Sequence, residues 1–182
     1  MKEIRLHGIG GMGTVKAGEI LVHAAVAEGR FGNSMPFFGF ERQGAPVTSF
    51  VRLDDQKIRP KNKVYHPHAV LVLDPSLLIS ANVFEGLRDD AVFVLNTGAG
   101  SSDIRKIVNS DKIKTVAYLD ATILALQLLG RPITNTVMLG AFVRATGWVG
   151  REHVEKKIEE FFDKKNVEAF RAGYDNAVVA AL

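Results

Sequence analysis

The segment that most constrains the fold joins a strand pattern to a helix pattern through four closely spaced glycines. Residues 2–7 alternate polar and apolar side chains as a strand does, and apolar side chains recur at helical spacing from Val15 to Ala27. Between them, GIGGMG at residues 8–13 follows a G-x-G-x-x-G pattern. A strand, a glycine loop and a helix in this order are typical of α/β domains.

The rest of the chain continues to alternate strand-like and helix-like segments. The predicted strands cover residues 47–53, 69–73, 91–95 and 115–119. The predicted helices cover residues 75–87, 103–108, 121–130 and 136–147, and two amphipathic helices follow, with apolar stripes at 154–162 and 167–178. Asp74 and Asp120 are expected to cap the helices that they precede.

Two segments interrupt this alternation. Residues 30–46 are rich in glycine and proline and are predicted to form a long ordered loop, which is more often functional or part of an interface than idle. Residues 57–59 are predicted to return as a short strand after a turn at 54–56. We therefore expect one Rossmann-like α/β domain over residues 1–182, with a mostly parallel open sheet, an antiparallel edge hairpin and helices on both faces.

The two helices predicted at residues 121–130 and 136–147 are apolar on nearly every side. We expect both to be buried on more than one face, or to meet another subunit.

Composition excludes several classes of protein. The sequence has no cysteine, which excludes disulfides and thiolate ligation of zinc or of an iron–sulfur cluster by this chain. Its net charge is only +3, with both signs interspersed, so nucleic acid is not an expected partner. No apolar run approaches the roughly 20 residues of a membrane span. Because the first residues run directly into a strand pattern, a cytoplasmic location is expected.

The glycine loop has the features of a phosphate site, because small residues and a helix N-terminus expose backbone N–H groups. A dinucleotide site also needs an acidic residue about 20 positions later, and residues 29–38 contain none. A nucleotide-hydrolase loop needs lysine and a hydroxyl residue after the last glycine, where Thr14 and Val15 stand. The alternative is that the glycines only let the helix and the strand pack closely.

Three other groups of residues are candidates with ordinary alternatives. Glu41 and Arg42 stand between glycines, suited to a carboxylate or phosphate partner or to a structural ion pair. Residues 96–100, NTGAG, either line a crevice at the end of a strand or form a turn. His66 and His68 are either metal ligands or exposed loop histidines. No catalytic triad, HExxH helix or carboxylate pair is present, so we assign no catalytic and no metal-binding residue.

Three segments together carry a resemblance to a known family. GIGGMGTVKAGEILVHAA (8–25), FFGFERQGAPVTSFVRL (37–53) and TNTVMLGAFVRATG (134–147) resemble the gamma subunits of the 2-oxoacid:ferredoxin oxidoreductases, above all of pyruvate synthase. The resemblance covers nearly the whole chain, residues 1–182, as a single pyruvate/ketoisovalerate oxidoreductase gamma-type domain. Met12 stands where glutamine is common in that family.

The resemblance implies a subunit of an anaerobic complex that is not active alone. Alpha, beta and delta subunits would carry thiamine diphosphate, magnesium and iron–sulfur clusters, with coenzyme A as co-substrate and ferredoxin as electron acceptor. Such enzymes decarboxylate pyruvate oxidatively to acetyl-CoA. The absence of cysteine agrees with clusters on other chains.

The resemblance and the loop chemistry together give a site hypothesis. Residues of the glycine loop are expected to face either the diphosphate of coenzyme A or an adjoining subunit: Gly8, Gly10, Gly11, Met12, Gly13 and Thr14. Those of the second loop are expected to shape the neighbouring interface: Glu41, Arg42, Gln43 and Gly44. Two other functions remain open at this point, a stand-alone Rossmann-like nucleotide-binding domain and an assembly module without a ligand.

Overall fold

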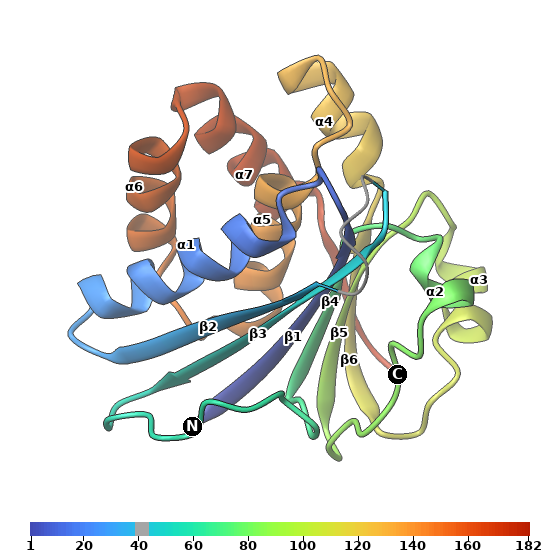
Figure 1. Ribbon diagram of the computed structural model, residues 1–182. Helices are drawn as coiled ribbons and strands as arrows, with labels where there is room; N and C mark the ends of the chain where they lie inside the picture. Colours follow the sequence, from blue (N-terminus) through green and yellow to red (C-terminus); the bar gives the residue numbers. More distant parts are fainter. Residues whose placement is uncertain (39–43) are drawn as a thin grey trace.

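The computed structural model describes residues 1–38 and 44–182, and within these ranges the chain forms seven strands and seven helices (Figure 1). The strands are β1 (Lys2–Ile9), β2 (Phe31–Phe38), β3 (Pro46–Asp54), β4 (Ala69–Val72), β5 (Ala91–Asn96), β6 (Ile113–Leu119) and β7 (Val178–Ala181). The helices are α1 (Thr14–Ala27), α2 (Leu77–Ser80), α3 (Ser101–Ile107), α4 (Ala121–Leu129), α5 (Asn135–Thr146), α6 (Arg151–Phe161) and α7 (Lys164–Asn176).

The strands form one mixed sheet in the order β2-β3-β1-β4-β5-β6-β7. Its centre is parallel, because β1, β4, β5 and β6 all run in the same direction. Antiparallel strands occupy both edges, with the hairpin β2–β3 beside β1 and β7 beside β6. This is the expected α/β fold, a parallel core with an antiparallel edge hairpin and helices on both faces.

The two faces of the sheet are covered differently (Figure 1). Ile4 and Leu6 of β1 lie on the first face, in a core completed by α1 and by α4 to α7. On the second face, α2 and α3 supply Leu77 and Ile104 to a smaller core over β4, β5 and β6. Among the described residues no helix covers the second face over β2 and β3, and the segment around Lys63 packs there instead.

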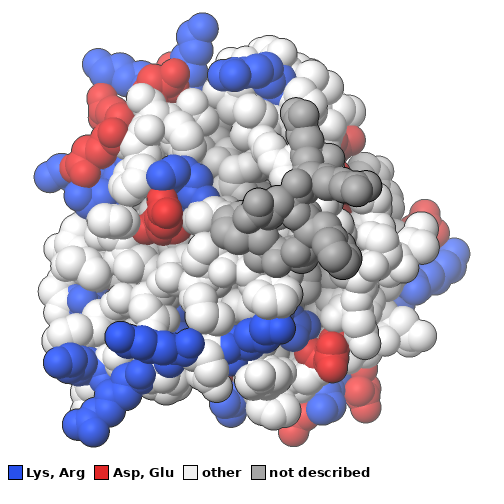
Figure 2. Space-filling model, viewed as in Figure 1, with Lys and Arg blue, Asp and Glu red and all other residues white. Residues whose placement is uncertain are grey.

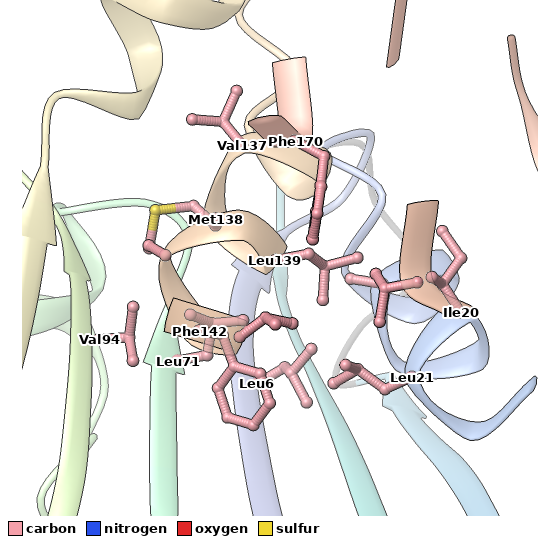
Figure 3. Close-up of a cluster of buried hydrophobic side chains, with 14 of the residues drawn as sticks. Leu6, Ile20, Leu21, Leu71, Val94, Val137, Met138, Leu139, Phe142 and Phe170 are labelled. Atoms are coloured by element: carbon pink, nitrogen blue, oxygen red, sulfur yellow. The ribbon is translucent and has the colours of Figure 1, made fainter. Parts of the chain in front are cut away.

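Helix α5 lies at the centre of the first core, as its apolar sequence predicts. Every residue from Asn135 to Val143 is buried, and Phe142 points toward Leu6 and Leu71 of the sheet (Figure 3). A glycine on each helix allows α5 and α7 to pack backbone to backbone. A Cβ atom at Gly140 would lie 2.1 Å from the carbonyl oxygen of Phe170. Burial of α4 on more than one face within this chain is wrong, since it buries Ala121 and Ala125 but leaves Ile123 and Leu126 about half exposed; contact of α4 with another subunit stays a prediction.

The long loop expected at residues 30–46 is wrong over residues 31–38, which form β2. The small residues that obscured the strand lie directly beneath α1. A Cβ atom at Gly18 of α1 would lie 2.9 Å from Oγ of Ser34 and 2.6 Å from Oγ of Ser49, so the helix and the hairpin touch closely. Pro36 is tolerated because β2 is an edge strand. The predicted return strand at 57–59 is absent from the described residues, and the edge hairpin is β2–β3 instead.

Two helix boundaries also differ from expectation. The helix predicted at 75–87 is limited to the four residues of α2, because Ala81 adopts an extended conformation with φ −137° and ψ 146°, and turns follow it. Val178 belongs to β7 and not to the last helix, which ends at Asn176. Within the described ranges, no helix combines the length and the apolar character of a membrane span.

Candidate functional site

The glycine loop connects the carboxyl end of β1 to the first turn of α1 (Figure 1). The N–H of Gly10 donates to the carbonyl oxygen of Ala45 at 2.9 Å, and the N–H of Met12 donates to that of Ile9 at 3.2 Å. Gly11 and Gly13 adopt positive φ angles of 96° and 74°, a conformation that other residues seldom take. The loop is therefore a defined turn that is fixed to the start of β3.

Two of the glycines are required by close packing inside the protein. A Cβ atom at Gly8 would lie 1.9 Å from Oγ1 of Thr14, and one at Gly13 would lie 2.3 Å from Nδ2 of Asn135. Gly11 differs, because a Cβ atom there would have no neighbour within 4 Å. The packing alternative therefore accounts for Gly8 and Gly13, while Gly11 faces open space.

The N-terminus of α5 meets the glycine loop through Asn135. This side chain is 1% exposed, and its Nδ2 lies 3.5 Å from the carbonyl oxygen of Gly13. Oγ1 of Thr14 is buried and has no hydrogen-bond partner among the described residues. Two helix N-termini, those of α1 and α5, therefore converge beside Gly13 and place the positive ends of two helix dipoles there.

Buried polar side chains hold the neighbouring strand ends in place. Nδ2 of Asn96 donates to the carbonyl oxygen of Leu73 at 2.8 Å, and Oδ1 of Asn96 accepts from the N–H of Ala121 at 3.0 Å. Thr134 donates to the same carbonyl of Leu73 at 3.1 Å. Asn96 is thus structural, and the residues directly after it, with Asp120, line a shallow cavity of about 310 Å³. Asp120 also caps α4 by accepting from the N–H of Ile123 at 3.0 Å, as predicted.

A larger cavity of about 540 Å³ lies on the second face of the sheet. Its floor includes Arg5 and His7 of β1, and Nε of Arg5 donates to Nε2 of His7 at 2.9 Å. Burial, reinforced by the adjacent Arg5 guanidinium, lowers the pKa of His7 to about 3. His7 is therefore neutral at neutral pH and carries its proton on Nδ1.

Beside this cavity, β1 and β3 share a buried ion pair. Nε of Arg52, a residue that is 2% exposed, donates to Oε1 of Glu3 at 2.9 Å. The remaining guanidinium nitrogens of Arg52 donate to Asn62 and to the carbonyl oxygen of Lys63. This pair anchors the segment after β3 to the second face. Sequence reasoning missed the row formed by Glu3, Arg5, His7 and Arg52, although the strict alternation in KEIRLH was its signal.

The two loop histidines both contact the protein backbone. Nδ1 of His68 accepts from the N–H of Glu3 at 3.1 Å, and Nδ1 of His66 lies 3.2 Å from the carbonyl oxygen of Gly86. Burial, followed by the charge of Arg88, lowers the pKa of His68. Within residues 1–38 and 44–182, no three histidine, cysteine or acidic side chains gather as a possible metal site.

The structure brings together one of the two predicted groups of site residues. The residues of the glycine loop form a single turn, and Gly44 adjoins it because Ala45 accepts from Gly10. Glu41, Arg42 and Gln43 lie outside the described residues. On the face seen in Figure 2, lysine and arginine side chains gather toward the lower left.

Comparisons with known proteins match the whole chain. Residues 3–176 match the family described as pyruvate ferredoxin/flavodoxin oxidoreductase. The chain is 44% identical to the pyruvate/ketoisovalerate oxidoreductases common subunit gamma of Pyrococcus furiosus, with all of both chains covered. It is 48% identical to the pyruvate synthase subunit PorC of Methanothermobacter thermautotrophicus, with 96% of this chain and 95% of the relative covered.

A solved structure agrees with these sequence relatives. The crystal structure of the pyruvate oxidoreductase subunit PORC of Thermotoga maritima superimposes with a TM-score of 0.86 at 36% identity, and 98% of each chain is covered. The family match and the identities extend across the fold, including the glycine loop and α5. The chain therefore belongs to the pyruvate ferredoxin/flavodoxin oxidoreductase family.

Proposed function

We propose that this chain is the gamma subunit of a multi-subunit pyruvate (2-oxoacid):ferredoxin oxidoreductase. In that role it supports the thiamine-dependent oxidative decarboxylation of pyruvate to acetyl-CoA, with electrons passed to ferredoxin. One observation carries the proposal: the relatives that match the chain from end to end are named as gamma or PorC subunits. A stand-alone nucleotide-binding domain would not be expected to match such subunits over its full length.

The redox and thiamine chemistry is assigned to the alpha, beta and delta subunits. An iron–sulfur cluster does not fit this chain, because the sequence has no cysteine to ligate it. The described residues also offer no group of three side chains for a metal ion. The gamma chain then contributes backbone donors and surfaces to a site completed by its partners, in an enzyme placed in the cytoplasm.

The glycine loop is the part of this chain that we assign to the diphosphate of coenzyme A. Among the described residues, the backbone N–H groups of Gly11, Gly13 and Thr14 have no hydrogen-bond acceptor. They stand where the N-termini of α1 and α5 converge, which favours an anion. Gly11 leaves the outer side of the loop open, so a diphosphate can approach the backbone closely.

The competing assignment is that the same loop contacts an adjoining subunit. The segment from Glu41 to Gly44 would then shape the interface beside the active site. Its supporting observation is the fixed connection between the loop and the start of β3 through Gly10 and Ala45. Both assignments place the loop beside the active site of the complex. They differ in what the backbone N–H groups contact, which is the diphosphate of coenzyme A in one and an adjoining subunit in the other.

A matched pair of variants at Gly11 separates the two assignments in the assembled complex. Gly11→Asp adds a negative charge in open space, and Gly11→Asn adds nearly the same shape without the charge. Both residues tolerate the positive φ better than most. We expect Gly11→Asp to raise the KM for coenzyme A at least about 10-fold relative to Gly11→Asn, because a like charge directly beside the diphosphate opposes its binding.

Subunit assembly is measured on the same preparations by native chromatography. An equal KM for coenzyme A in two intact complexes would contradict the coenzyme assignment. Loss of assembly in both variants would favour the subunit interface. The gamma-subunit proposal itself is tested by native purification. Recovery as a lone monomer that binds NAD or ATP at micromolar concentration would contradict it, and an unchanged affinity for coenzyme A without this chain would support a purely structural role.

A further inference from the structure

The cavity on the second face of the sheet has a floor of hydrogen-bond donors. Nη2 of Arg5 donates to the carbonyl oxygens of Val83 and Glu85 at 2.9 and 2.8 Å, and Nε donates to His7. Nη1 of Arg5 makes no hydrogen bond to another described residue. Because His7 accepts at Nε2, its Nδ1 carries a proton, and this N–H also has no acceptor among residues 1–38 and 44–182.

The charge of the cavity is positive. Arg5 and Lys63 both line it, and neither forms an ion pair with a carboxylate within the described part of the chain. The one acidic side chain in its lining belongs to Glu85, which is exposed to solvent. Arg5 is buried and Lys63 is partly exposed, and the charge of Glu85 acts on Arg5. Two cations against one carboxylate leave an excess of one positive charge for a ligand to neutralise.

The walls of the cavity are apolar and aromatic. The rings of Phe37 and Phe50 lie 6.5 Å apart between their centroids, and Nζ of Lys63 lies 3.6 Å from the centroid of Phe37. Leu77 and Val64 complete the wall on the side away from the sheet. A volume of about 540 Å³ is in the range of small-molecule sites. The body of a ligand that fits here is apolar, and only its head is polar.

We propose that this cavity binds an organic monocarboxylate with an aromatic or branched aliphatic body. The carboxylate accepts hydrogen bonds from Nη1 of Arg5 and Nδ1 of His7, with the ammonium of Lys63 beside it. The body of the ligand packs against Phe37 and Phe50. The two oxygens of a carboxylate match the two separate donors, Nη1 of Arg5 and Nδ1 of His7, and its single charge matches the net charge of the lining. This site goes beyond the proposed function, because it requires neither coenzyme A nor the partner subunits.

The test is an NMR titration of the full ¹⁵N-labelled chain with phenylacetate and with its neutral analogue phenylacetamide. We expect saturable shifts centred on Arg5, His7 and Phe50, with a Kd of about 1 mM or tighter for phenylacetate. Phenylacetamide should bind at least about 5-fold more weakly, because it lacks the charge. Equal binding of the two probes, or no saturable shift at these residues up to about 50 mM, would overturn the proposal.

Variants locate the carboxylate within the cavity. Lys63→Gln should weaken phenylacetate binding about 3-fold to 10-fold, whereas Lys61→Gln changes an exposed lysine outside the cavity and should leave it within about 1.5-fold. His7→Leu should weaken it about 10-fold by removing a donor to a charged group. The spectrum of each variant reports its folding. Equal effects of Lys63→Gln and Lys61→Gln, in two folded variants, would contradict the proposed position of the carboxylate.

Discussion

The buried histidine on β1 should make the stability of this protein depend on pH in a specific window. The folded-state pKa of His7 is lowered from 6.5 to about 3, first by burial and then by Arg5. Between these two values the unfolded chain binds a proton that the folded chain does not. Stability is therefore complete above the unfolded pKa and falls as the pH drops from 6.5 toward 3.

The magnitude follows from the linkage of one proton to unfolding. Lowering the pH from 7 to 5 should reduce the free energy of unfolding by about 2 kcal/mol through His7 alone. The carboxyl groups of Asp54, Glu155 and Asp163 have lowered folded-state pKa values, so their contributions to stability are lost mainly as the pH falls below their unfolded pKa of about 4. His68 contributes in the same direction as His7 because its pKa is also lowered.

The contribution of His7 is isolated by comparison with His7→Gln, which offers Arg5 an acceptor but does not titrate. Urea unfolding at pH 7 and pH 5, followed by the fluorescence of Trp148, gives the loss of stability for each protein. We expect the wild type to lose about 2 kcal/mol more than the variant, and the difference to persist in high salt because the group is buried. Equal losses in the two proteins would refute the assignment of a neutral, buried His7.

Three further predictions concern stability and are measured by urea unfolding at pH 7. Gly140→Ala should lower the free energy of unfolding by about 3 kcal/mol or more, because its Cβ would lie 2.1 Å from a carbonyl oxygen of α7. The control Gly100→Ala has no neighbour within 4 Å of the new Cβ and should lower it by less than about 1 kcal/mol. Similar losses in the two variants would contradict the close approach of α5 and α7. Arg52→Met should cost about 3 kcal/mol, because it leaves the buried Glu3 with only its longer contact of 3.4 Å to the exposed Arg88, and adding Glu3→Gln should recover part of this loss; an unchanged loss in the double variant would argue against the ion pair. Asp120→Ala should cost about 1 kcal/mol by removing the cap of α4, and no loss would show that the cap is dispensable.

The sequence predicts the parallel centre of the fold well because local signals agree with the tertiary structure there. The strand, loop and helix at residues 2–27 are confirmed, as are the short apolar strands β4, β5 and β6. The cap at Asp120 and the burial of α5 are confirmed for the same reason. In each case the pattern of one segment is sufficient, and distant contacts only reinforce it.

The edge strands of the sheet are not predicted from the sequence, because contacts with residues far away in the chain determine them. β2 contains Gly32 and Ser34, which are poor strand formers in isolation but fit beneath α1. After α2, Val83 and Leu87 recur at helical spacing and are both buried, but they lie in turns and not in a helix. Gly86 and Asp90 in this segment have positive φ angles, which no α-helix contains. β7 is short and follows α7 with almost no interruption, so its apolar residues read as more of the helix.

In the candidate site, too, local sequence predicts some features and distant packing determines the others. The sequence identifies the glycine loop, but it cannot show that Gly13 is required by Asn135, a residue 122 positions away. The alternation in β1 predicts a strand but does not show whether its polar face lies in water or in the protein, and in antiparallel sheets such a face is commonly solvated. The structure buries Arg5 and His7 beneath the segment after β3 and the turns after α2, which makes a cavity that no local pattern indicates.

The contact between Gly13 and Asn135 has a consequence for biosynthesis. During translation, β1 and α1 emerge first, but the neighbour that confines Gly13 belongs to a helix that leaves the ribosome more than a hundred residues later. The nascent loop can form its bond to Ala45 early, but the packing of Asn135 against Gly13 waits until α5 has been made and docked. A truncated polypeptide ending before residue 134 would carry the complete glycine motif and still lack the neighbour that confines Gly13.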